Sequence, residues 1–228
     1  MRINKYLALK QYATRRGADS LIEQSKVTIN GRVAKLGDKI TEQDVVVVKG
    51  AQRKPSYLYF AYNKPKSAKK SENNYEDDDK KSRPKFPNDV FPLVTLGRND
   101  HGLEIYTNDG RVTDVATNPK TSPEKEYVVE TFSKIRDSFQ ANMEKGLDID
   151  GYLTQKCRVK VIDETTFAIA LREGKKHQVR RMCEALHNDV SDILRTRIGN
   201  IAIGPLNEGS YRPIKDEELD EFLKIIGF

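Results

Sequence analysis

Two chemically informative residues of this sequence are neighbouring arginines in the predicted first turn of a helix, where the helix dipole disfavours positive charge. Thr14 is suited to cap a helix, so Arg15 and Arg16 fall in its predicted first turn. The dipole disfavours each cation there by about 0.3 to 1 kcal/mol. An arginine pair in this position favours a phosphate partner, and we expect Lys5 and Lys26 to contribute further phosphate contacts.

The net positive charge is concentrated around these residues. The 228-residue chain has 40 Lys plus Arg and 34 Asp plus Glu. Residues 1–55 hold 12 of the basic and 5 of the acidic residues, so this segment has a net charge of +7 and the rest of the chain has a net charge of −1. A basic module joined to a near-neutral body predicts binding to a polyanion, with nucleic acid as first candidate and an acidic membrane surface as second. A solvated basic face without a partner is the alternative.

Reactive side chains elsewhere give weaker signals. Asp100 and His101 are neighbours and could form an acid–base pair, although a solvent-facing loop histidine is the commoner case. Cys157 and Cys183 lack the spacing of a zinc site or a disulfide framework, so we expect two reduced thiols. With 32% charged residues, no apolar run of membrane-spanning length and no signal-peptide core, the sequence predicts a soluble cytoplasmic protein.

Hydrophobic spacing predicts two short helices followed by a small sheet in residues 1–50. The first helix contains Ile3 and Leu7, and the second runs from Thr14 to about Gln24. The remaining elements are strands at residues 27–29 and 45–48 and a tight turn at Asn30-Gly31.

This segment, from RINKYLALKQYATRRGADSLIEQSKVTINGRVAKLGDKI through DVVVV, resembles the S4 RNA-binding domain. The resemblance covers residues 2–49 and is strongest in the portion RR...LIEQSKVTINGRV. It implies that the polyanion bound by the basic module is RNA.

Composition then separates a linker and an insertion from a second domain at 57–228. Residues 51–56 are predicted to be the linker. Residues 66–88 hold 7 Lys or Arg, 5 Asp or Glu and almost no aliphatic residues, so they are predicted to be a flexible charged insertion. An RNA-facing loop that orders on binding and a merely solvated insertion are equally compatible with this composition.

The second domain is predicted to be α+β with a largely antiparallel sheet, because strands outnumber helices and adjacent strands are hairpin-linked. One predicted helix buries Val179, Met182, Cys183 and Leu186, and an amphipathic helix closes the chain. Predicted strands lie within residues 57–65, 91–112, 122–130 and 167–172, with two more short strands within 193–214.

The pieces TNDG, EKEY, EGKKHQVRRMCEAL and RTRIGNIAIGPLNEGSYRPI, in this order, resemble the RsuA-like family of ribosomal RNA pseudouridine synthases. The match spans residues 57–226 apart from the insertion. It implies isomerisation of uridine in ribosomal RNA without metal or organic cofactor. The uracil is detached from its ribose, turned, and rejoined through carbon.

The resemblance also implies site residues. The family's Lys-x-Tyr element places Tyr127 behind Lys125, and its aromatic face could stack on a flipped base. Arg180 is the expected basic partner of the catalytic Asp, with Arg181 as the alternative, and Ile198 is the expected aliphatic wall. The cations expected to hold backbone phosphates are Arg172, Lys175 and Lys176; His177 and His187 are expected to be structural or RNA-surface residues.

The catalytic Asp is where the sequence departs from the family pattern. An ungapped alignment places Gly97 at the Asp position and Asp100 at a Ser/Thr position, leaving Arg180 without a carboxylate. A gapped alignment matches Asp100 to the catalytic Asp of the family. It needs two compensating shifts, and each would move the side chains of a strand to its opposite face, so the ungapped alignment is favoured. Asp100 can replace the missing group only if the loop folds back, because three residues span up to about 10 Å.

Three hypotheses follow. The chain is an active synthase that uses Asp100 in a remodelled loop, or a catalytically silent member that binds ribosomal RNA as an assembly factor, or a generic S4-type RNA binder. In each case the expected partners are ribosomal RNA or pre-ribosomal particles, not a membrane, and the expected state is a monomer.

Overall fold

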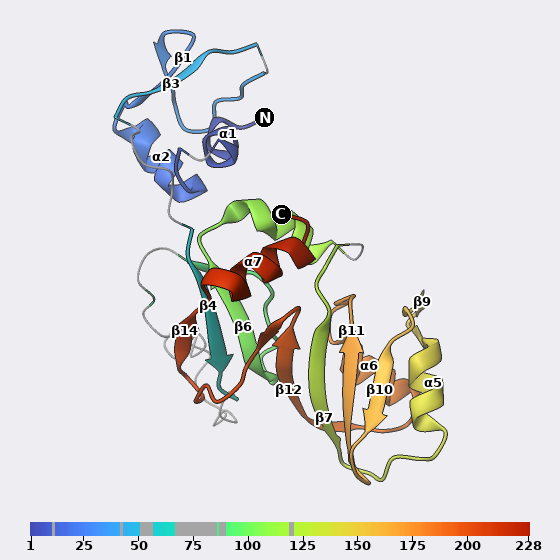
Figure 1. Cartoon of the computed structure of the whole chain (residues 1–228). Helices are drawn as coiled ribbons and strands as arrows, with labels where there is room; N and C mark the ends of the chain where they lie inside the picture. Colours follow the sequence, from blue (N-terminus) through green and yellow to red (C-terminus); the bar gives the residue numbers. More distant parts are fainter. Residues whose placement is uncertain (11, 42, 51–56, 67–85, 87–89, 119–120) are drawn as a thin grey trace, which may run out of the picture.

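A computed structural model describes residues 1–10, 12–41, 43–50, 57–66, 86, 90–118 and 121–228. These residues form a small N-terminal module and a larger body built on one long sheet (Figure 1). The predicted linker at 51–56 lies outside the described residues. So does the predicted insertion at 66–88, apart from Lys66 and Phe86.

The N-terminal module confirms the predicted order of elements. It consists of α1 (Ile3–Leu9), α2 (Arg15–Glu23) and a sheet of order β2-β1-β3 with β1 (Val27–Ile29), β2 (Arg32–Val33) and β3 (Val46–Val48). Thr14 caps α2, since its hydroxyl accepts a hydrogen bond from the Gly17 amide at 3.1 Å. Asn30 and Gly31 have φ values of 51° and 82°, as a tight β1–β2 hairpin requires.

The body contains a sheet of order β10-β11-β7-β12-β6-β4-β14, in which the β12–β6 pair is parallel and the other pairs are antiparallel. The fold class predicted from sequence is therefore confirmed. The bounds along this path are β10 (Arg158–Val161), β11 (Thr166–Leu171), β7 (Lys125–Thr131), β12 (Val190–Ile198), β6 (His101–Thr107), β4 (Tyr59–Lys64) and β14 (Tyr211–Pro213). Two short strands, β5 (Phe91–Pro92) and β13 (Ile201–Ala202), pair with β6 and β12.

Two apolar clusters hold helices against the two halves of this sheet. Phe139 of α5 (Phe139–Lys145) and Met182 of α6 (Gln178–Ala185) pack with residues of β7, β10, β11 and β12. Phe222 of α7 (Asp216–Ile225) packs with β4 and β6, beside η1 (Gly110–Val112) and α4 (Thr113–Thr117). The active-site candidates lie where the two halves meet, along β6, β12 and β7.

Several elements of the body were not predicted from the sequence. They are α4, α5, β10 and the hairpin of β8 (Asp148–Ile149) and β9 (Tyr152–Leu153). Only short strands were predicted after residue 193, whereas β12 is a nine-residue central strand. Charged residues interrupt its apolar pattern, and two register shifts against β7 disturb its alternation. No helix in the described ranges is long and apolar enough to cross a membrane.

The TNDG turn has a structural role at the start of the body. Asp109 is fully buried and accepts hydrogen bonds from the Tyr59 hydroxyl at 2.8 Å and from the Arg111 guanidinium at 2.6 and 2.8 Å. The Asn108 side-chain oxygen accepts from the Leu58 amide at 2.8 Å. The turn thus fixes the point at which the chain enters β4.

Lys125 opens β7 as a buried cation that joins the segment before β7 to the end of β11. Its ammonium group donates to the Ser122 hydroxyl at 2.6 Å and to the carbonyls of Pro123 and Arg172 at 3.2 and 3.1 Å. All three acceptors are neutral, so burial is not offset by a carboxylate. Burial, with a smaller contribution from the positive charge of Arg195, lowers the pKa of Lys125 to about 8.

We expect Lys125→Met to remove a specific pH dependence of stability. Between about pH 8 and the ordinary lysine pKa of 10.5, the unfolded chain holds a proton that the folded chain has released. This group therefore makes the wild type more stable as pH rises, by at most about 3 kcal/mol. The measurement is urea unfolding of both proteins at pH 7, 8, 9 and 10. A wild-type-minus-mutant stability that stays flat or falls with pH contradicts the assignment.

Candidate active site

A pocket of about 450 Å³ opens between the loop before β6 and the loop before α6. Its floor comes from β7 and β12, in which Tyr127 and Arg195 are directly paired. The lining residues include five cations and one carboxylate. They are Val94, Thr95, Leu96, Gly97, Asp100, Lys125, Tyr127, Leu171, Gly174, Lys175, Lys176, His177, Gln178, Val179, Arg180, Ile193 and Arg195.

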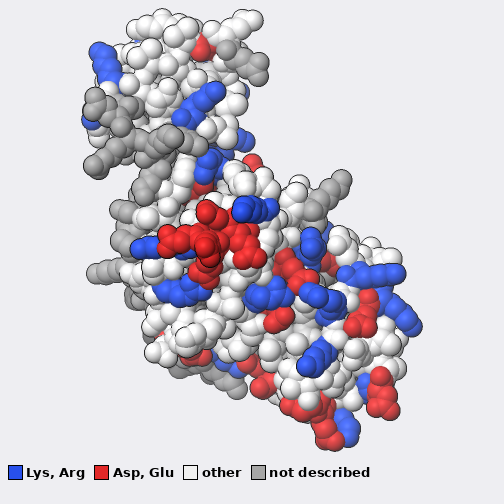
Figure 2. Space-filling model, viewed as in Figure 1, with Lys and Arg blue, Asp and Glu red and all other residues white. Residues whose placement is uncertain are grey.

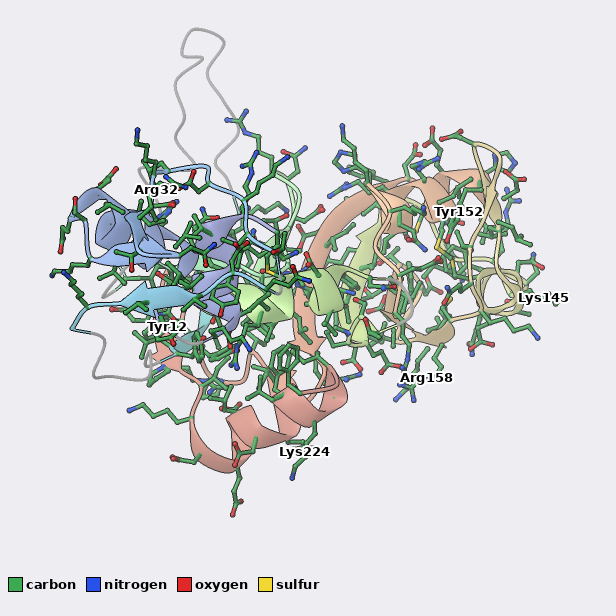
Figure 3. The ribbon with its side chains drawn as sticks, turned by 90° about the horizontal axis from the view of Figure 1, so that it is seen from above. Tyr12, Arg32, Lys145, Tyr152, Arg158 and Lys224 are labelled. Carbon is green, nitrogen blue, oxygen red and sulfur yellow. The ribbon has the colours of Figure 1, made fainter. Side chains whose placement is uncertain are left out.

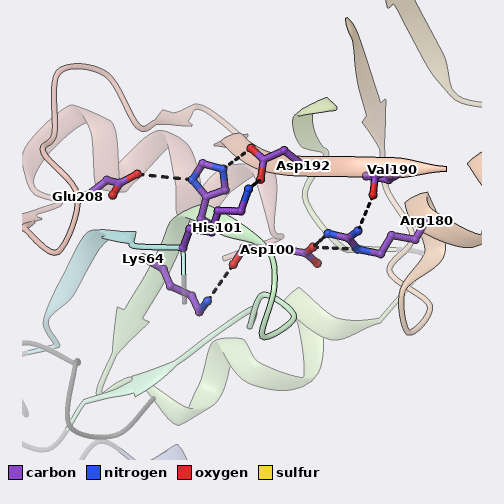
Figure 4. A network of polar contacts seen from close by, with 8 residues as sticks. Lys64, Asp100, His101, Arg180, Val190, Asp192 and Glu208 are labelled. Carbon is purple, nitrogen blue, oxygen red and sulfur yellow. Dashed lines mark hydrogen bonds and ion pairs between the residues drawn. The ribbon is translucent and has the colours of Figure 1, made fainter. Parts of the chain in front are cut away.

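Asp100 and Arg180 form an ion pair across this pocket (Figure 4). Arg180 donates from Nη2 and Nε to Asp100 Oδ1, at 2.6 and 3.2 Å, and from Nη1 to the Val190 carbonyl at 3.3 Å. The Asp100 side chain is 13% exposed. The expectation that Arg180 lacks a carboxylate partner is therefore wrong, because the loop folds back and brings Asp100 to it.

The fold-back places the Asp100 carboxylate in the space that a side chain on residue 97 would use. The Asp100 amide donates to the Gly97 carbonyl at 3.2 Å, which closes a turn. A Cβ built on Gly97 would lie 2.7 Å from Asp100 Oδ2 and 3.7 Å from His177 Cε1. Residue 97 and residue 100 thus compete for one position, and in this chain the glycine leaves it to Asp100.

Two buried polar side chains that were not predicted from the sequence hold the first part of the loop. Glu104 is 3% exposed and accepts from the Leu96 amide at 2.8 Å. Arg195 is 1% exposed and donates to the carbonyls of Val94 at 2.7 Å and Leu103 at 2.6 Å. A charged residue inside a strand pattern is the signal that points to such positions, since burying it requires partners.

The opposite wall is the segment that leads into α6. Glu173 is buried and accepts from the Gln178 side chain at 2.5 Å, the Tyr152 hydroxyl at 2.5 Å and the Gln155 amide at 2.8 Å. His177 has a left-handed φ of 53°, which is uncommon for a residue other than glycine. Glu173 therefore fixes the base of a tight turn that presents Lys175, Lys176 and His177 to the pocket.

The structure brings together some of the predicted site residues and separates others. Asp100, Tyr127 and Arg180 line one pocket. Arg181 instead contacts the Ile149 carbonyl and Asp150 in the β8–β9 hairpin. Ile198 is fully buried in the cluster around Phe222 and is not a lining residue, whereas the aliphatic residues of the pocket are Val94, Leu96, Leu171, Val179 and Ile193.

The predicted phosphate-binding cations occupy two regions. Lys175 and Lys176 are exposed at the pocket, and Arg172 is exposed nearby with its carbonyl bound by Lys125. Lys5, Arg15, Arg16 and Lys26 are exposed on the N-terminal module.

Arg15 and Arg16 also line a smaller pocket of about 290 Å³, together with Asn108, Thr113 and Asp114 of the body. Lys5 lies 3.9 Å from Asp114 in the same region. On the face shown in Figure 2, acidic side chains gather over α7 below the module. Acidic side chains of the body therefore lie close to at least one cation of the module, Lys5.

Known proteins share this combination of modules. A model of the RNA pseudouridylate synthase family matches residues 43–185, and a model of the S4 domain matches residues 1–46. The dual-specificity RNA pseudouridine synthase RluF of Salmonella typhi is 34% identical over 229 residues, which cover 99% of this chain and 79% of the relative. The ribosomal small subunit pseudouridine synthase A of Haemophilus influenzae is 30% identical over 237 residues, which cover 98% and 100%.

A solved structure supports the same assignment. The crystal structure of a pseudouridylate synthase superimposes with a TM-score of 0.66 at 26% identity and covers 97% of this chain and 99% of that one. The family model spans more than half of the chain and includes the loop of Asp100, the strand of Tyr127 and the helix of Arg180. The chain therefore belongs to the RNA pseudouridylate synthase family and carries an N-terminal S4 domain.

Proposed function

We propose that this protein is an active pseudouridine synthase of ribosomal RNA and that Asp100 is its catalytic carboxylate. The observation that supports this is the Arg180–Asp100 pair, in the pocket that Tyr127 also lines. A catalytically silent protein has no need of a carboxylate that Arg180 holds in this pocket. We further propose that it acts as a cytoplasmic monomer on ribosomal RNA or pre-ribosomal particles.

The reaction breaks the N1–C1′ bond of uridine and joins C5 to C1′, so N1 ends with a hydrogen and C5 loses one. Both hydrogen bonds that Arg180 donates to Asp100 go to Oδ1, which leaves Oδ2 directed at the space beside Gly97. A carboxylate held there can stabilise, or bond to, the positive charge that develops at C1′ as the first bond breaks. Arg180 fixes the direction of that carboxylate.

Tyr127 and the apolar side chains around it hold the uracil base of the target uridine. A uridine must leave its stack to reach Asp100, and an aromatic face can recover about 1 to 3 kcal/mol by stacking on it. Leu171, Val179 and Ile193 provide apolar surface around the site. Exclusion of water by these side chains protects the detached base and strengthens the charge interactions inside the pocket.

The remaining cations fit the substrate backbone. Lys175 and Lys176 lie at the rim, and Arg195 and Lys125 contribute buried positive charge below it. Phosphates of the nucleotides flanking the target uridine would meet this positive pocket first. The S4 domain adds a second group of cations for RNA at a distance from the site.

We expect Asp100→Asn to abolish pseudouridine formation, with a loss of about three or more powers of ten in rate. The amide keeps the shape of the side chain but not its charge. The measurement is pseudouridine mapping of ribosomal RNA from cells that lack the gene and from the same cells carrying wild type or Asp100→Asn.

The matched control is Asp220→Asn, which removes one negative charge from the exposed surface of α7. It should leave the pseudouridine level unchanged. The proposal is wrong if a gene-dependent pseudouridine persists with Asp100→Asn. If no pseudouridine depends on the gene while the protein still binds ribosomal RNA, the silent assembly-factor hypothesis takes its place.

We also expect the S4 domain to bind RNA phosphates through Arg15 and Arg16. Arg15→Ala/Arg16→Ala should weaken binding to RNAs of different sequence and reduce the slope of log affinity against log salt by about 0.7 to 0.9 per lost contact. The control is Lys145→Ala/Lys160→Ala, which removes two exposed charges from α5 and β10, at the opposite end of the molecule from the S4 domain (Figure 3). Equal slopes for the two double variants would reject this assignment.

A further inference from the structure

Asp100 is followed directly by a histidine that is anchored on a different strand. His101 begins β6, and its Nε2 lies 2.7 Å from Oδ2 of Asp192 on β12 (Figure 4). The two side chains are 13% and 19% exposed. The other oxygen of Asp192 contacts the Lys66 ammonium group, and His101 Nδ1 lies 3.8 Å from Glu208.

A lysine holds the main chain on the other side of Asp100. Lys64, the last residue of β4, donates to the carbonyls of Asp100 at 2.8 Å and Arg98 at 3.2 Å. Three elements therefore hold Asp100. Lys64 of β4 binds its carbonyl, Arg180 of α6 binds its carboxylate, and β12 anchors the side chain of the following residue, His101.

These contacts matter because the loop has little regular backbone pairing at this point. The turn that brings Asp100 back rests on one hydrogen bond of 3.2 Å to Gly97. Regular pairing starts at His101 and Gly102, which are opposite Leu194 and Arg195 of β12. Gly102 has a φ of 103°, and a Cβ there would lie 2.4 Å from the Arg195 carbonyl, so the two strands meet closely. A small shift of residue 101 would carry Asp100 with it.

We propose that His101 and Asp192 form a positioning pair that sets the main chain at Asp100, so that its carboxylate meets Arg180 and the substrate. This inference rests on the proposed function for its effect on rate. Residue 97 is followed by a longer stretch of loop before β6, whereas residue 100 adjoins the strand. Moving the carboxylate next to β6 makes its position depend on how residue 101 is anchored.

The first test separates positioning from binding. His101→Leu removes the ring nitrogens, whereas His101→Gln keeps a nitrogen donor at similar reach toward Asp192. With unmodified ribosomal RNA from cells lacking the gene, His101→Leu should lower kcat by about 10- to 100-fold and leave KM within about threefold. His101→Gln should stay within about threefold of wild type in kcat. Asp192→Ala, which also removes the contact with Lys66, should match His101→Leu in kcat. The double variant should be no slower than either, since both single variants remove the same His101–Asp192 contact.

The second test reads the position of Asp100 without activity. The Arg180 Nε–H group, assigned by loss of its signal in Arg180→Lys, should show a nitrogen–proton NMR resonance typical of a hydrogen-bonded arginine. It should shift in His101→Leu and Asp192→Ala and keep its place in His101→Gln and in the Asp220→Asn control. Amide spectra of each variant establish that the body remains folded.

The two readouts separate failure of this inference from failure of the proposed function. If the wild type has no activity but the Arg180 resonance still shifts in His101→Leu, the proposed function is wrong and the positioning pair stands. If His101→Leu and Asp192→Ala change neither the Arg180 resonance nor kcat, the positioning pair is wrong and the proposed function stands. A loss of kcat equal in His101→Leu and His101→Gln also overturns it, because the preserved hydrogen bond would then be irrelevant.

Discussion

The site depends on one ion pair between side chains that are 80 residues apart in the chain, Asp100 and Arg180. Each comes from an irregular or terminal segment, so the sheet beneath them has to fix the distance. The parallel pairing of β6 with β12 and the antiparallel pairing of β12 with β7 set that frame. Two of these strands, β7 and β12, supply the pocket floor, and β7 places Tyr127 in the lining of the pocket that the pair also lines. Loss of the strand frame would therefore separate Asp100, Arg180 and Tyr127 from one another.

The pocket is also unusual in its charge. Asp100 is the single carboxylate among its described lining residues, against Lys125, Lys175, Lys176, Arg180 and Arg195. Two of these cations, Lys125 and Arg195, are buried and hydrogen-bond to neutral oxygen atoms. Burying uncompensated charge costs free energy, and a polyanionic substrate is the partner that offsets this cost. An RNA backbone around a flipped uridine meets that requirement.

Much of this arrangement could be predicted from the sequence. The capped helix at Thr14, the Asn30-Gly31 turn and the buried face of α6 follow from local patterns. Tyr127 and Arg180 were expected from the resemblance of their motifs to those of the family. The position of the carboxylate could not be predicted, because a loop that folds back brings residues 97 and 100 to one place while an alignment treats them as alternatives. Arg195 and the His101–Asp192 pair were missed because their partners lie 91 to 101 residues away in the sequence. Glu104 was missed because its contact with the Leu96 amide, eight residues earlier, depends on a loop that gives no periodic signal. The hairpin of β8 and β9 is too short to give a periodic signal.

We propose that Asp100 supplies the catalytic carboxylate from the space that a side chain on residue 97 would otherwise occupy. Gly97 does not have a left-handed φ, so its backbone can accept a side chain once the Asp100 carboxylate is gone. The most direct test is the rate of pseudouridine formation by Gly97→Asp/Asp100→Ser compared with Asp100→Ser alone. The account predicts that the double variant recovers at least about 100-fold over the single one, because its new carboxylate enters the vacated space beside Arg180. Equal inactivity of the two folded variants, with wild type active, would contradict it.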